Sequence, residues 1–164
     1  MIVQQNVSLK PYNTFGIDEN AAYLAIVDSI DDLDEIFMSG RFRSQKKMIL
    51  GGGSNILLTR GFTGVVAKNE IRGLHTLNET DDEVLVSVGA GENWHQFVLW
   101  CVERGYGGVE NLSLIPGTVG AAPMQNIGAY GVELRDVFHS LEAYEMKSGK
   151  LDRKSTRLNS SHLA

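Results

Sequence analysis

The sequence predicts a mixed fold of helices and strands that presents two glycine-rich loops to one ligand. One observation is a strand, helix and strand pattern within residues 22–50, a unit that favours parallel strands joined by a crossover. Another is an amphipathic helical pattern that starts near Asn93. The third is that Gly51–Asn55 and Ile115–Gly131 are rich in glycine and contain no charged residue. We therefore expect a hydrophobic scaffold whose loops hold the ligand.

Length and composition indicate a soluble globular protein. The chain has 164 residues, of which 43% are hydrophobic and 21% charged, enough for one core or for two small lobes that share a cleft. No apolar run approaches the roughly 18 to 20 residues of a membrane span, and the N-terminus does not resemble a signal peptide. We expect a cytoplasmic monomer with no membrane partner. The formal charge of −5, without a basic stripe, argues against a nucleic-acid partner.

The first part of the chain is predicted to deliver a glycine-rich loop at the end of a strand. Asn13–Ile17 is expected to form a compact turn. Ala22–Val27 is predicted as a strand, and Ser29 resembles the start of a capping box ahead of a helix. Met48–Leu50 is the next predicted strand. Its carboxyl end places the backbone of Gly51–Asn55 where N–H groups could converge on an anion.

The second part contains the clearest helix of the sequence. Val65–Ala67 and Glu83–Gly89 are predicted strands. Asn93 is a suitable N-cap, and Gly105 is a suitable stop. Leu141–Met146 is predicted as a further strand before a turn. The apolar stripe of the helix consists of Trp94, Phe97, Val98, Cys101 and Val102.

Two residues with reactive side chains are assigned structural roles. Cys101 is the only cysteine, so it cannot form an internal disulfide, and its place in the stripe predicts a buried packing residue. His95 falls on the polar side of the same helix. A lone histidine in that position is more typical of a surface residue than of a catalyst, and we expect no metal site.

The loop Gly51–Asn55 is a weak signal when taken alone. It is not a P-loop, because no Gly-Lys-Ser/Thr follows, and it is not a dinucleotide fingerprint, because Ile56 stands where the last glycine is required. A flexible turn between two short strands remains the alternative. Ser54 and Asn55 favour a phosphate site, because they add a hydroxyl and an amide where exposed N–H groups already favour phosphate oxygens.

The second loop is predicted to lie against a flat ring such as an isoalloxazine. Its small side chains would let a ring approach the backbone, whose N–H groups could reach the polar edge of the ring. Gln125 and Asn126 add side-chain donors. The alternative is a tight turn that joins a helix to a strand within a core.

The C-terminal segment departs from the pattern of the rest. Asp152–His162 is polar and basic, has neither helical nor strand periodicity, and resembles the translation of a sequencing-library adapter. We therefore expect residues 151–164 to be a non-native tail and exclude them from the predicted fold. A natural disordered tail is the alternative.

Five motifs in order and spacing carry a family resemblance. They are Asn13–Gly16, Leu50–Ile56, Val88–Trp94, Gly108–Pro123 and Gln125–Gly131. Over residues 8–150 the chain resembles the amino-terminal part of the UDP-N-acetylenolpyruvoylglucosamine reductases (MurB), also called UDP-N-acetylmuramate dehydrogenases. The resemblance implies a truncated α+β fold of the FAD-binding PCMH type, similar to vanillyl-alcohol oxidase relatives, with two lobes that grip an extended FAD. The lobes are expected at residues 1–64 and 65–150, the second incomplete.

The resemblance also assigns site residues. The FAD pyrophosphate is expected to contact Gly51, Gly52, Gly53, Ser54 and Asn55. The flavin and its linker are expected along residues 115–120 and beyond, at Ile115, Pro116, Gly117, Val119, Gly120, Ala121, Ala122, Ile127 and Gly128. The loop's own side chains add Gln125 and Asn126 as expected donors to the cofactor. Some family members carry serines where Ala121 and Ala122 stand, so only backbone contacts are expected there. Tyr130 is expected on the substrate side.

The family implies a reaction in bacterial peptidoglycan synthesis. Its members use NADPH and FAD to reduce UDP-N-acetylglucosamine enolpyruvate to UDP-N-acetylmuramate. Their catalytic serine, arginine and glutamate, and their substrate-binding domain, correspond to positions beyond Lys150, so we assign no catalytic residue and expect this chain alone to be unstable and inactive. The alternatives are another FAD-binding PCMH-type oxidoreductase, or a non-catalytic flavin- or nucleotide-binding fragment.

Overall fold

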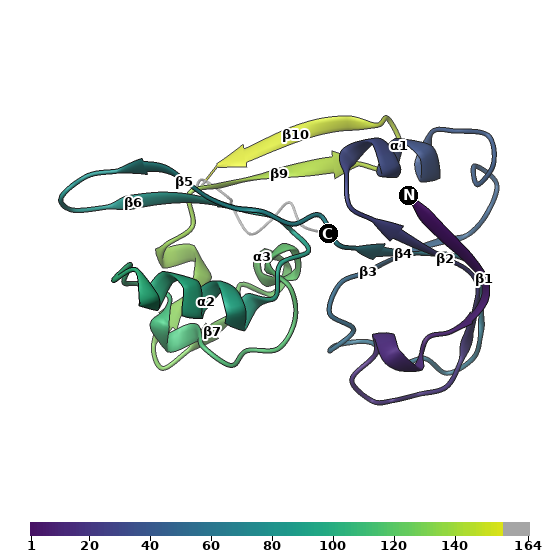
Figure 1. Ribbon diagram of the computed structural model, residues 1–164, viewed down its shortest axis with the longest axis horizontal. Helices are drawn as coiled ribbons and strands as arrows, with labels where there is room; N and C mark the ends of the chain where they lie inside the picture. The colour runs from purple at the N-terminus through teal and green to yellow at the C-terminus, as the bar shows by residue number, and fades with distance from the viewer. Residues whose placement is uncertain (156–164) are drawn as a thin grey trace.

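The computed structural model describes residues 1–155 as two lobes joined by a short linker, residues 70–73 (Figure 1). No helix within this range is long and apolar enough to cross a membrane. The first lobe contains β1 (Ile2–Ser8), η1 (Lys10–Tyr12), β2 (Asn20–Val27), α1 (Ile30–Phe37), β3 (Lys47–Leu50) and β4 (Phe62–Asn69). The second contains β5 (Leu74–Glu79), β6 (Val84–Val88), α2 (Trp94–Glu103), η2 (Glu110–Leu112), η3 (Val119–Ala121), α3 (Ala122–Gln125), β7 (Gly128–Ala129), β8 (Val132–Glu133), η4 (Leu134–Asp136), β9 (Ser140–Glu145) and β10 (Lys150–Ser155).

The first lobe is built on one mixed sheet in the order β1-β2-β4-β3. β1 is antiparallel to β2, whereas β2 and β3 are both parallel to β4. The predicted strands at residues 22–27 and 48–50 are confirmed, but they do not pair with each other because β4 lies between them. Val65, Val66 and Ala67 are all buried, and a strand with both faces covered takes an inner position in a parallel sheet.

The extent of β4 corrects the predicted lobe boundary. A division between residues 64 and 65 would cut this strand, which continues to Asn69 and pairs there with Val27 of β2. Val65 and Ala67 pack with α1 on one face of the sheet, and Val66 packs with Leu50 on the other. The first lobe therefore includes all of β4.

The first helix starts where the sequence predicted. The Ser29 hydroxyl accepts a hydrogen bond from the Asp32 N–H at 3.3 Å, so Ser29 is the N-cap of α1. The Asp32 side chain reaches back to the N–H of Asp28, at 3.0 Å, instead of to Ser29. The two side chains thus satisfy two free N–H groups, as in a capping box. The second of these N–H groups belongs to Asp28, one residue before the N-cap.

The second lobe packs around α2, which confirms the predicted helix. The Asn93 side chain accepts from the Gln96 N–H at 3.0 Å, and Gly105 follows the helix with φ +74°. Cys101 is buried as predicted, and burial raises the pKa of its thiol to about 11. Val102 is 50% exposed, contrary to its predicted place in the stripe. At about 100° per residue it lies roughly 80° around the helix from Trp94, at the edge of the buried face.

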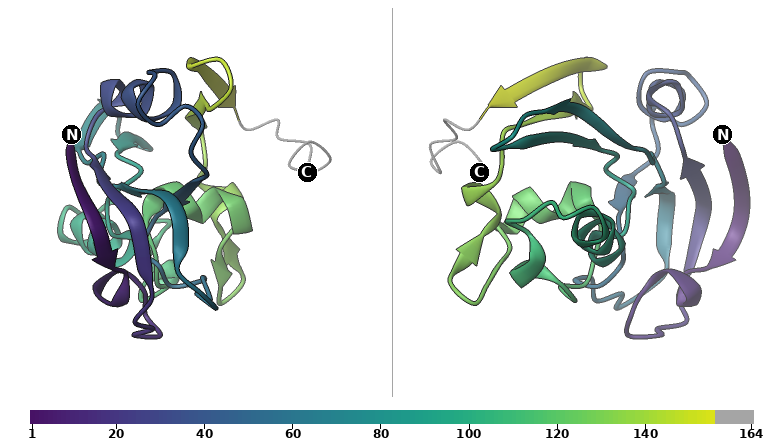
Figure 2. Two further views of the ribbon diagram at one scale, coloured as in Figure 1. Left: turned by 90° about the vertical axis from the view of Figure 1, so that its right-hand side faces the viewer. Right: turned by 60° about the vertical axis from the view of Figure 1, so that its left-hand side comes forward.

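Two hairpins, β5–β6 and β9–β10, extend from the second lobe (Figure 1). The turn of the β9–β10 hairpin reaches α1, as both views in Figure 2 show. There the Tyr144 hydroxyl donates to Asp34 Oδ1 at 2.7 Å, and its ring packs on Phe37. Burial raises the pKa of Tyr144 to about 12, and the Asp34 carboxylate acts in the same direction. The hairpin therefore provides a contact between the two lobes in addition to the linker.

The strand β10 differs from the sequence expectation. Residues 151–155 were expected outside the fold, but Lys150–Ser155 pairs antiparallel with β9, from Glu145 to Ser140. Pairing of this kind uses backbone groups and needs no apolar alternation. The non-native origin of residues 151–164 stays a prediction, and residues 156–164 of the predicted tail lie outside the described residues.

The first glycine-rich loop rests on the compact Asn13–Ile17 element. The Asn13 side chain is buried and donates to the carbonyls of Leu9 and Ile17, at 2.8 and 2.9 Å. The next residue, Thr14, donates its N–H to the Gly53 carbonyl at 3.1 Å. Gly53 has φ +68°, and a Cβ at this position would lie 2.0 Å from the Tyr12 carbonyl oxygen. Only glycine fits here.

The Gly53→Ala substitution is expected to destabilise the first lobe strongly. Gly16→Ala is the matched control, because Gly16 has a similar φ of +63° but nothing within 4 Å of the added Cβ. Gly16→Ala should lower the free energy of unfolding by about 1–2 kcal/mol, the cost of the left-handed backbone alone. Gly53→Ala should lower it clearly more, because the backbone at Tyr12 must also move to make room for the Cβ. Urea denaturation of both variants measures the difference, and equal losses would contradict the packing described.

Trp94 makes a buried hydrogen bond that Trp100, on the same helix, does not make. The Trp94 Nε1–H donates to the Leu112 carbonyl at 2.7 Å. Trp94→Phe should lower the free energy of unfolding by about 1–3 kcal/mol, because the Leu112 carbonyl loses its partner. Trp100→Phe should cost less, since its ring makes no hydrogen bond among the described residues and loses only part of its contact with Tyr106, Arg104 and the core of the second lobe. Thermal unfolding of the two variants tests this order. A larger loss of stability in Trp100→Phe than in Trp94→Phe would contradict the prediction.

Candidate functional site

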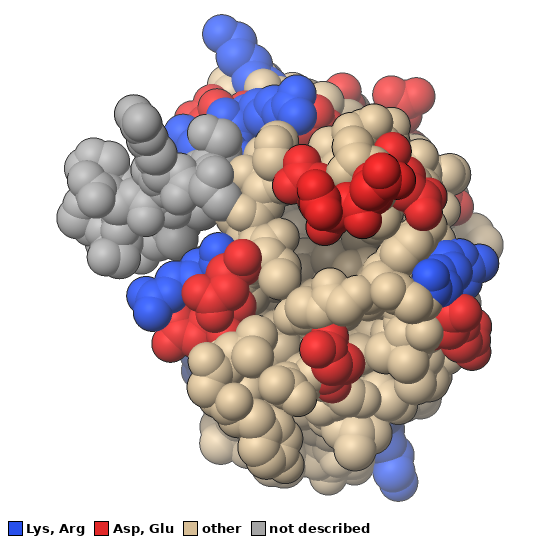
Figure 3. Space-filling view, turned by 90° about the vertical axis from the view of Figure 1, so that its left-hand side faces the viewer, with Lys and Arg blue, Asp and Glu red and all other residues tan. Residues whose placement is uncertain are grey.

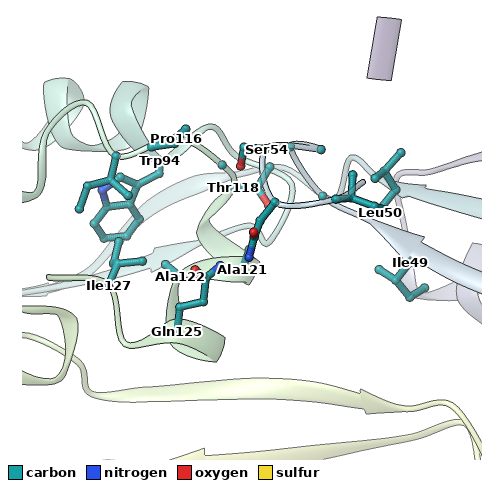
Figure 4. Close-up of a pocket in the computed structure, with 17 residues that line it drawn as sticks. Ile49, Leu50, Ser54, Trp94, Pro116, Thr118, Ala121, Ala122, Gln125 and Ile127 are labelled. Atoms are coloured by element: carbon teal, nitrogen blue, oxygen red, sulfur yellow. The ribbon is translucent and has the colours of Figure 1, made fainter. Parts of the chain in front are cut away.

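The two glycine-rich loops lie on one cleft between the lobes, with a volume of about 230 Å³ (Figure 4). This is below the roughly 300–1,000 Å³ of pockets that enclose a whole small-molecule ligand, so the cleft fits part of an extended one. None of the lining residues is charged. They are Ile49, Leu50, Gly51, Gly52, Gly53, Ser54, Asn55, Ile56, Trp94, Ile115, Pro116, Gly117, Thr118, Ala121, Ala122, Gln125 and Ile127.

The glycines let the two loops touch each other. A Cβ on Gly52 would lie 2.9 Å from the Gly117 Cα, and one on Gly51 would lie 2.8 Å from the Thr118 hydroxyl. Gly117 itself has φ +119° and faces the Ser54 hydroxyl. Glycine was predicted here so that a ligand could approach the backbone; the structure shows that the approach of the opposite loop already requires it.

The segment before α2 fixes the second loop. Trp94 donates its backbone N–H to the Gly117 carbonyl at 3.1 Å, and Val119 donates to the Glu92 carbonyl at 2.9 Å. These two bonds enclose a bridge between Asn93 and Thr118. In such an antiparallel pair the N–H of Thr118 points away from its partner, and it makes no hydrogen bond within residues 1–155.

Several polar groups of the cleft lack protein partners among the described residues. The N–H groups of Gly52–Asn55 donate no hydrogen bond there. The hydroxyls of Ser54 and Thr118 and the side-chain amide of Gln125 likewise have none, yet no described side-chain atom is both fully buried and unpaired. The two hydroxyls and the amide are therefore open to solvent or a ligand. Consecutive backbone N–H groups without a protein partner favour an anion where they point to one place.

Polar and apolar parts of the cleft are separated. In Figure 4, Ser54 and Thr118 lie together near the centre, while Trp94 and Ile127 lie toward one end and Leu50 toward the other. Acidic side chains gather instead on the outer face shown in Figure 3. The exposed turn at residues 81–83 carries three of the acidic residues of the second lobe. The cleft thus offers neutral donors beside an apolar wall.

Most of the predicted site residues line this cleft. All of Gly51–Asn55 do so, and so do Ile115, Pro116, Gly117, Ala121, Ala122, Gln125 and Ile127. Val119 and Gly120 do not. Val119 packs on the core of the second lobe, and Gly120 donates to the Ala90 carbonyl at 2.9 Å and leaves no room for a Cβ beside Ala90.

Asn126, Gly128 and Tyr130 also lie off the cleft. The Asn126 amide, predicted as a ligand donor, donates to Glu133 Oε2 at 2.8 Å, and its oxygen accepts from the Arg135 N–H. Gly128 pairs with Glu133 in the β7–β8 hairpin. Tyr130 is 90% exposed in the turn of that hairpin, with φ +53°. Its predicted place on the substrate side stays a prediction.

Sequence reasoning missed part of the cleft. Trp94 was assigned only to the apolar stripe, although it also lines the cleft, and Thr118 had no individual role. Ile49, Leu50 and Ile56 extend the lining on either side of the first loop; their position next to Gly51–Asn55 was the available signal. His95, predicted as a surface residue, is half-buried, with Nδ1 3.1 Å from the Ser113 hydroxyl.

Comparison with known proteins agrees with this geometry. The chain is 50% identical over 149 residues to UDP-N-acetylenolpyruvoylglucosamine reductase of Amoebophilus asiaticus, covering 91% of this chain and 44% of that protein. It is 51% identical over 158 residues to the Pseudomonas aeruginosa protein of the same name, covering 94% and 47%. The crystal structure of MurB from Thermus caldophilus aligns with a TM-score of 0.72 at 26% identity, over 95% of this chain and 53% of that one.

These similarities confirm the predicted resemblance and the FAD-binding fold. The chain spans about half the length of the curated relatives it matches. The family model described as FAD binding domain matches residues 21–153, which is most of the chain and includes both glycine-rich loops. The protein therefore belongs to the family of FAD binding domains.

Proposed function

We propose that the cleft binds FAD and that, within a longer polypeptide, it serves the NADPH-dependent reduction of UDP-N-acetylglucosamine enolpyruvate to UDP-N-acetylmuramate. The observation that supports FAD most directly is the uncharged cleft in which the N–H groups of Gly52–Asn55 have no described protein partner. The assignment of the substrate and of NADPH is based on the reductases that the chain resembles.

The polar centre of the cleft fits a pyrophosphate. Consecutive N–H groups of Gly52–Asn55 supply fixed partial positive charge, as backbone anion sites do. The hydroxyls of Ser54 and Thr118 lie next to them on facing loops. A hydroxyl or N–H that donates to a phosphate oxygen makes a charge-assisted hydrogen bond, so neutral residues suffice for an anionic ligand.

The apolar wall fits the flavin ring and its linker. Ala121 and Ala122 present little beyond their backbone, so a flat ring can approach closely. Trp94 and Ile127 close one end of the cleft, and Gln125 offers an amide that can donate or accept at the polar edge of a ring. These residues bind and orient the cofactor and keep water from part of its surface.

FAD, when bound, supplies the hydride-transfer chemistry that no side chain can provide. The role of this chain is to hold and orient the cofactor, and none of its residues is proposed to protonate the substrate. We place the reaction in the cytoplasm, where it would serve cell-wall biogenesis, cell shape and division. The remaining half of a polypeptide of the relatives' length would supply the substrate-binding and catalytic residues.

Ser54→Asp is expected to weaken FAD binding about 100-fold, because like charges brought together at a binding site cost several kcal/mol. Ser44→Asp is the matched control: Ser44 is exposed on the first lobe, outside the cleft, and the change in net charge is the same. Quenching of flavin fluorescence during titration measures both dissociation constants. Equal affinities in the two variants would place the pyrophosphate elsewhere.

The 164-residue chain alone is expected to give no turnover of NADPH with the UDP-enolpyruvyl sugar, even with FAD in excess. The physical reason is that residues 1–155 are proposed to hold the cofactor, and none of them is proposed as the proton donor. Absorbance at the NADPH band, with a full-length reductase as positive control, measures the rate. Sustained substrate-dependent oxidation by the purified chain would refute the assignment of catalysis to the other half.

A further inference from the structure

The backbone is strained immediately before the second loop enters the cleft. Leu114 has φ +62° and its side chain is 77% exposed. A left-handed conformation is uncommon for a bulky residue and persists only where its surroundings impose it. Exposure of the side chain shows that its own packing does not impose it. The next residue, Ile115, begins the stretch that lines the cleft.

A histidine contacts this strained residue. His95 Nδ1 lies 3.3 Å from the Leu114 backbone nitrogen and 3.1 Å from the Ser113 hydroxyl oxygen. A backbone N–H can only donate, so Nδ1 must accept, and the proton of the neutral imidazole is assigned to Nε2. His95 therefore captures the N–H that the left-handed turn directs toward α2.

The imidazole is itself held in place. His95 belongs to the first turn of α2, which Asn93 caps. Its neighbour Trp94 donates to the Leu112 carbonyl at 2.7 Å. Two consecutive side chains of one rigid helix thus bind residues 112 and 114, one as donor and one as acceptor. This pairing fixes both the position and the direction of the chain as it enters the cleft.

We propose that His95 is a positioning residue for the cofactor loop: by accepting the Leu114 N–H it maintains the left-handed turn that sets Ile115–Thr118 against the first glycine-rich loop. This proposal rests on the proposed binding of FAD. Without the acceptor, Leu114 relaxes toward an ordinary backbone conformation and the N–H groups that follow lose their alignment. His95 would then contribute to FAD affinity without touching the cofactor.

His95→Ala is expected to weaken FAD binding about 10-fold, the loss that follows from one hydrogen bond. His95→Asn should restore affinity to within about threefold of the unchanged protein, because the asparagine oxygen stands close to the position of Nδ1 and accepts from the same N–H. His95→Gln should not, since its amide reaches the position of Nε2. Gln96→Ala, exposed on the same turn, is the control for helix stability.

Two measurements distinguish this proposal from the proposed function. Flavin fluorescence quenching gives the FAD affinities, and amide hydrogen exchange in the absence of FAD reports the Leu114 N–H directly. Faster Leu114 exchange in His95→Ala, reversed in His95→Asn, supports the positioning role, even if no variant binds FAD. Absence of FAD binding in every variant would contradict the proposed function but not the role of His95. Unchanged exchange in His95→Ala, or equal FAD losses in the alanine and asparagine variants, would overturn the role of His95.

Discussion

The contact between the two glycine-rich loops is the constraint on which the cleft depends. The backbone of Gly52 packs against that of Gly117 so closely that a Cβ would lie 2.9 Å from the opposing Cα. One loop follows a strand of the first lobe and the other follows α2 of the second. Any larger residue at this contact would separate the lobes and open the wall of the cleft. The backbone contact between the lobes therefore requires these glycines, independently of any contact with a ligand.

The same use of glycine recurs at the linker. A Cβ on Gly89 would lie 2.5 Å from the Ile71 carbonyl oxygen, and one on Gly91 would lie 2.6 Å from the Glu70 Cα. Gly91 also donates its N–H to the Ile71 carbonyl at 2.8 Å. The segment that leads into α2 is therefore held against the linker by backbone packing. The Tyr144 hydroxyl on Asp34 adds a side-chain contact between the lobes at the β9–β10 hairpin.

Local signals in the sequence predicted α2, β2, β3 and both loops, because caps, apolar spacing and charge depletion are properties of a few neighbouring residues. Contacts set by pairing over longer distances were not predictable. The apolar run at Val65 did not show how far β4 extends, so the lobe boundary was placed too early. Nor could the spacing of residues in the sequence show that the Asn126 amide donates its hydrogen bond to Glu133, since this contact depends on the turn at residues 130–131.

For the proposed pyrophosphate site, a cleft without charged residues requires loops that are held in place. A mobile lysine or arginine can follow an anion, but the dipole of an N–H group stabilises charge only where the backbone already points. A site made of such dipoles must be oriented before the ligand arrives, because ordering the loop on binding would consume affinity. The bonds from Thr14 to Gly53 and from Trp94 to Gly117 provide that order in the two loops. The hydrogen bond from Leu114 to His95 extends the same order to the start of the second loop. Rigidity here therefore takes the place of charge.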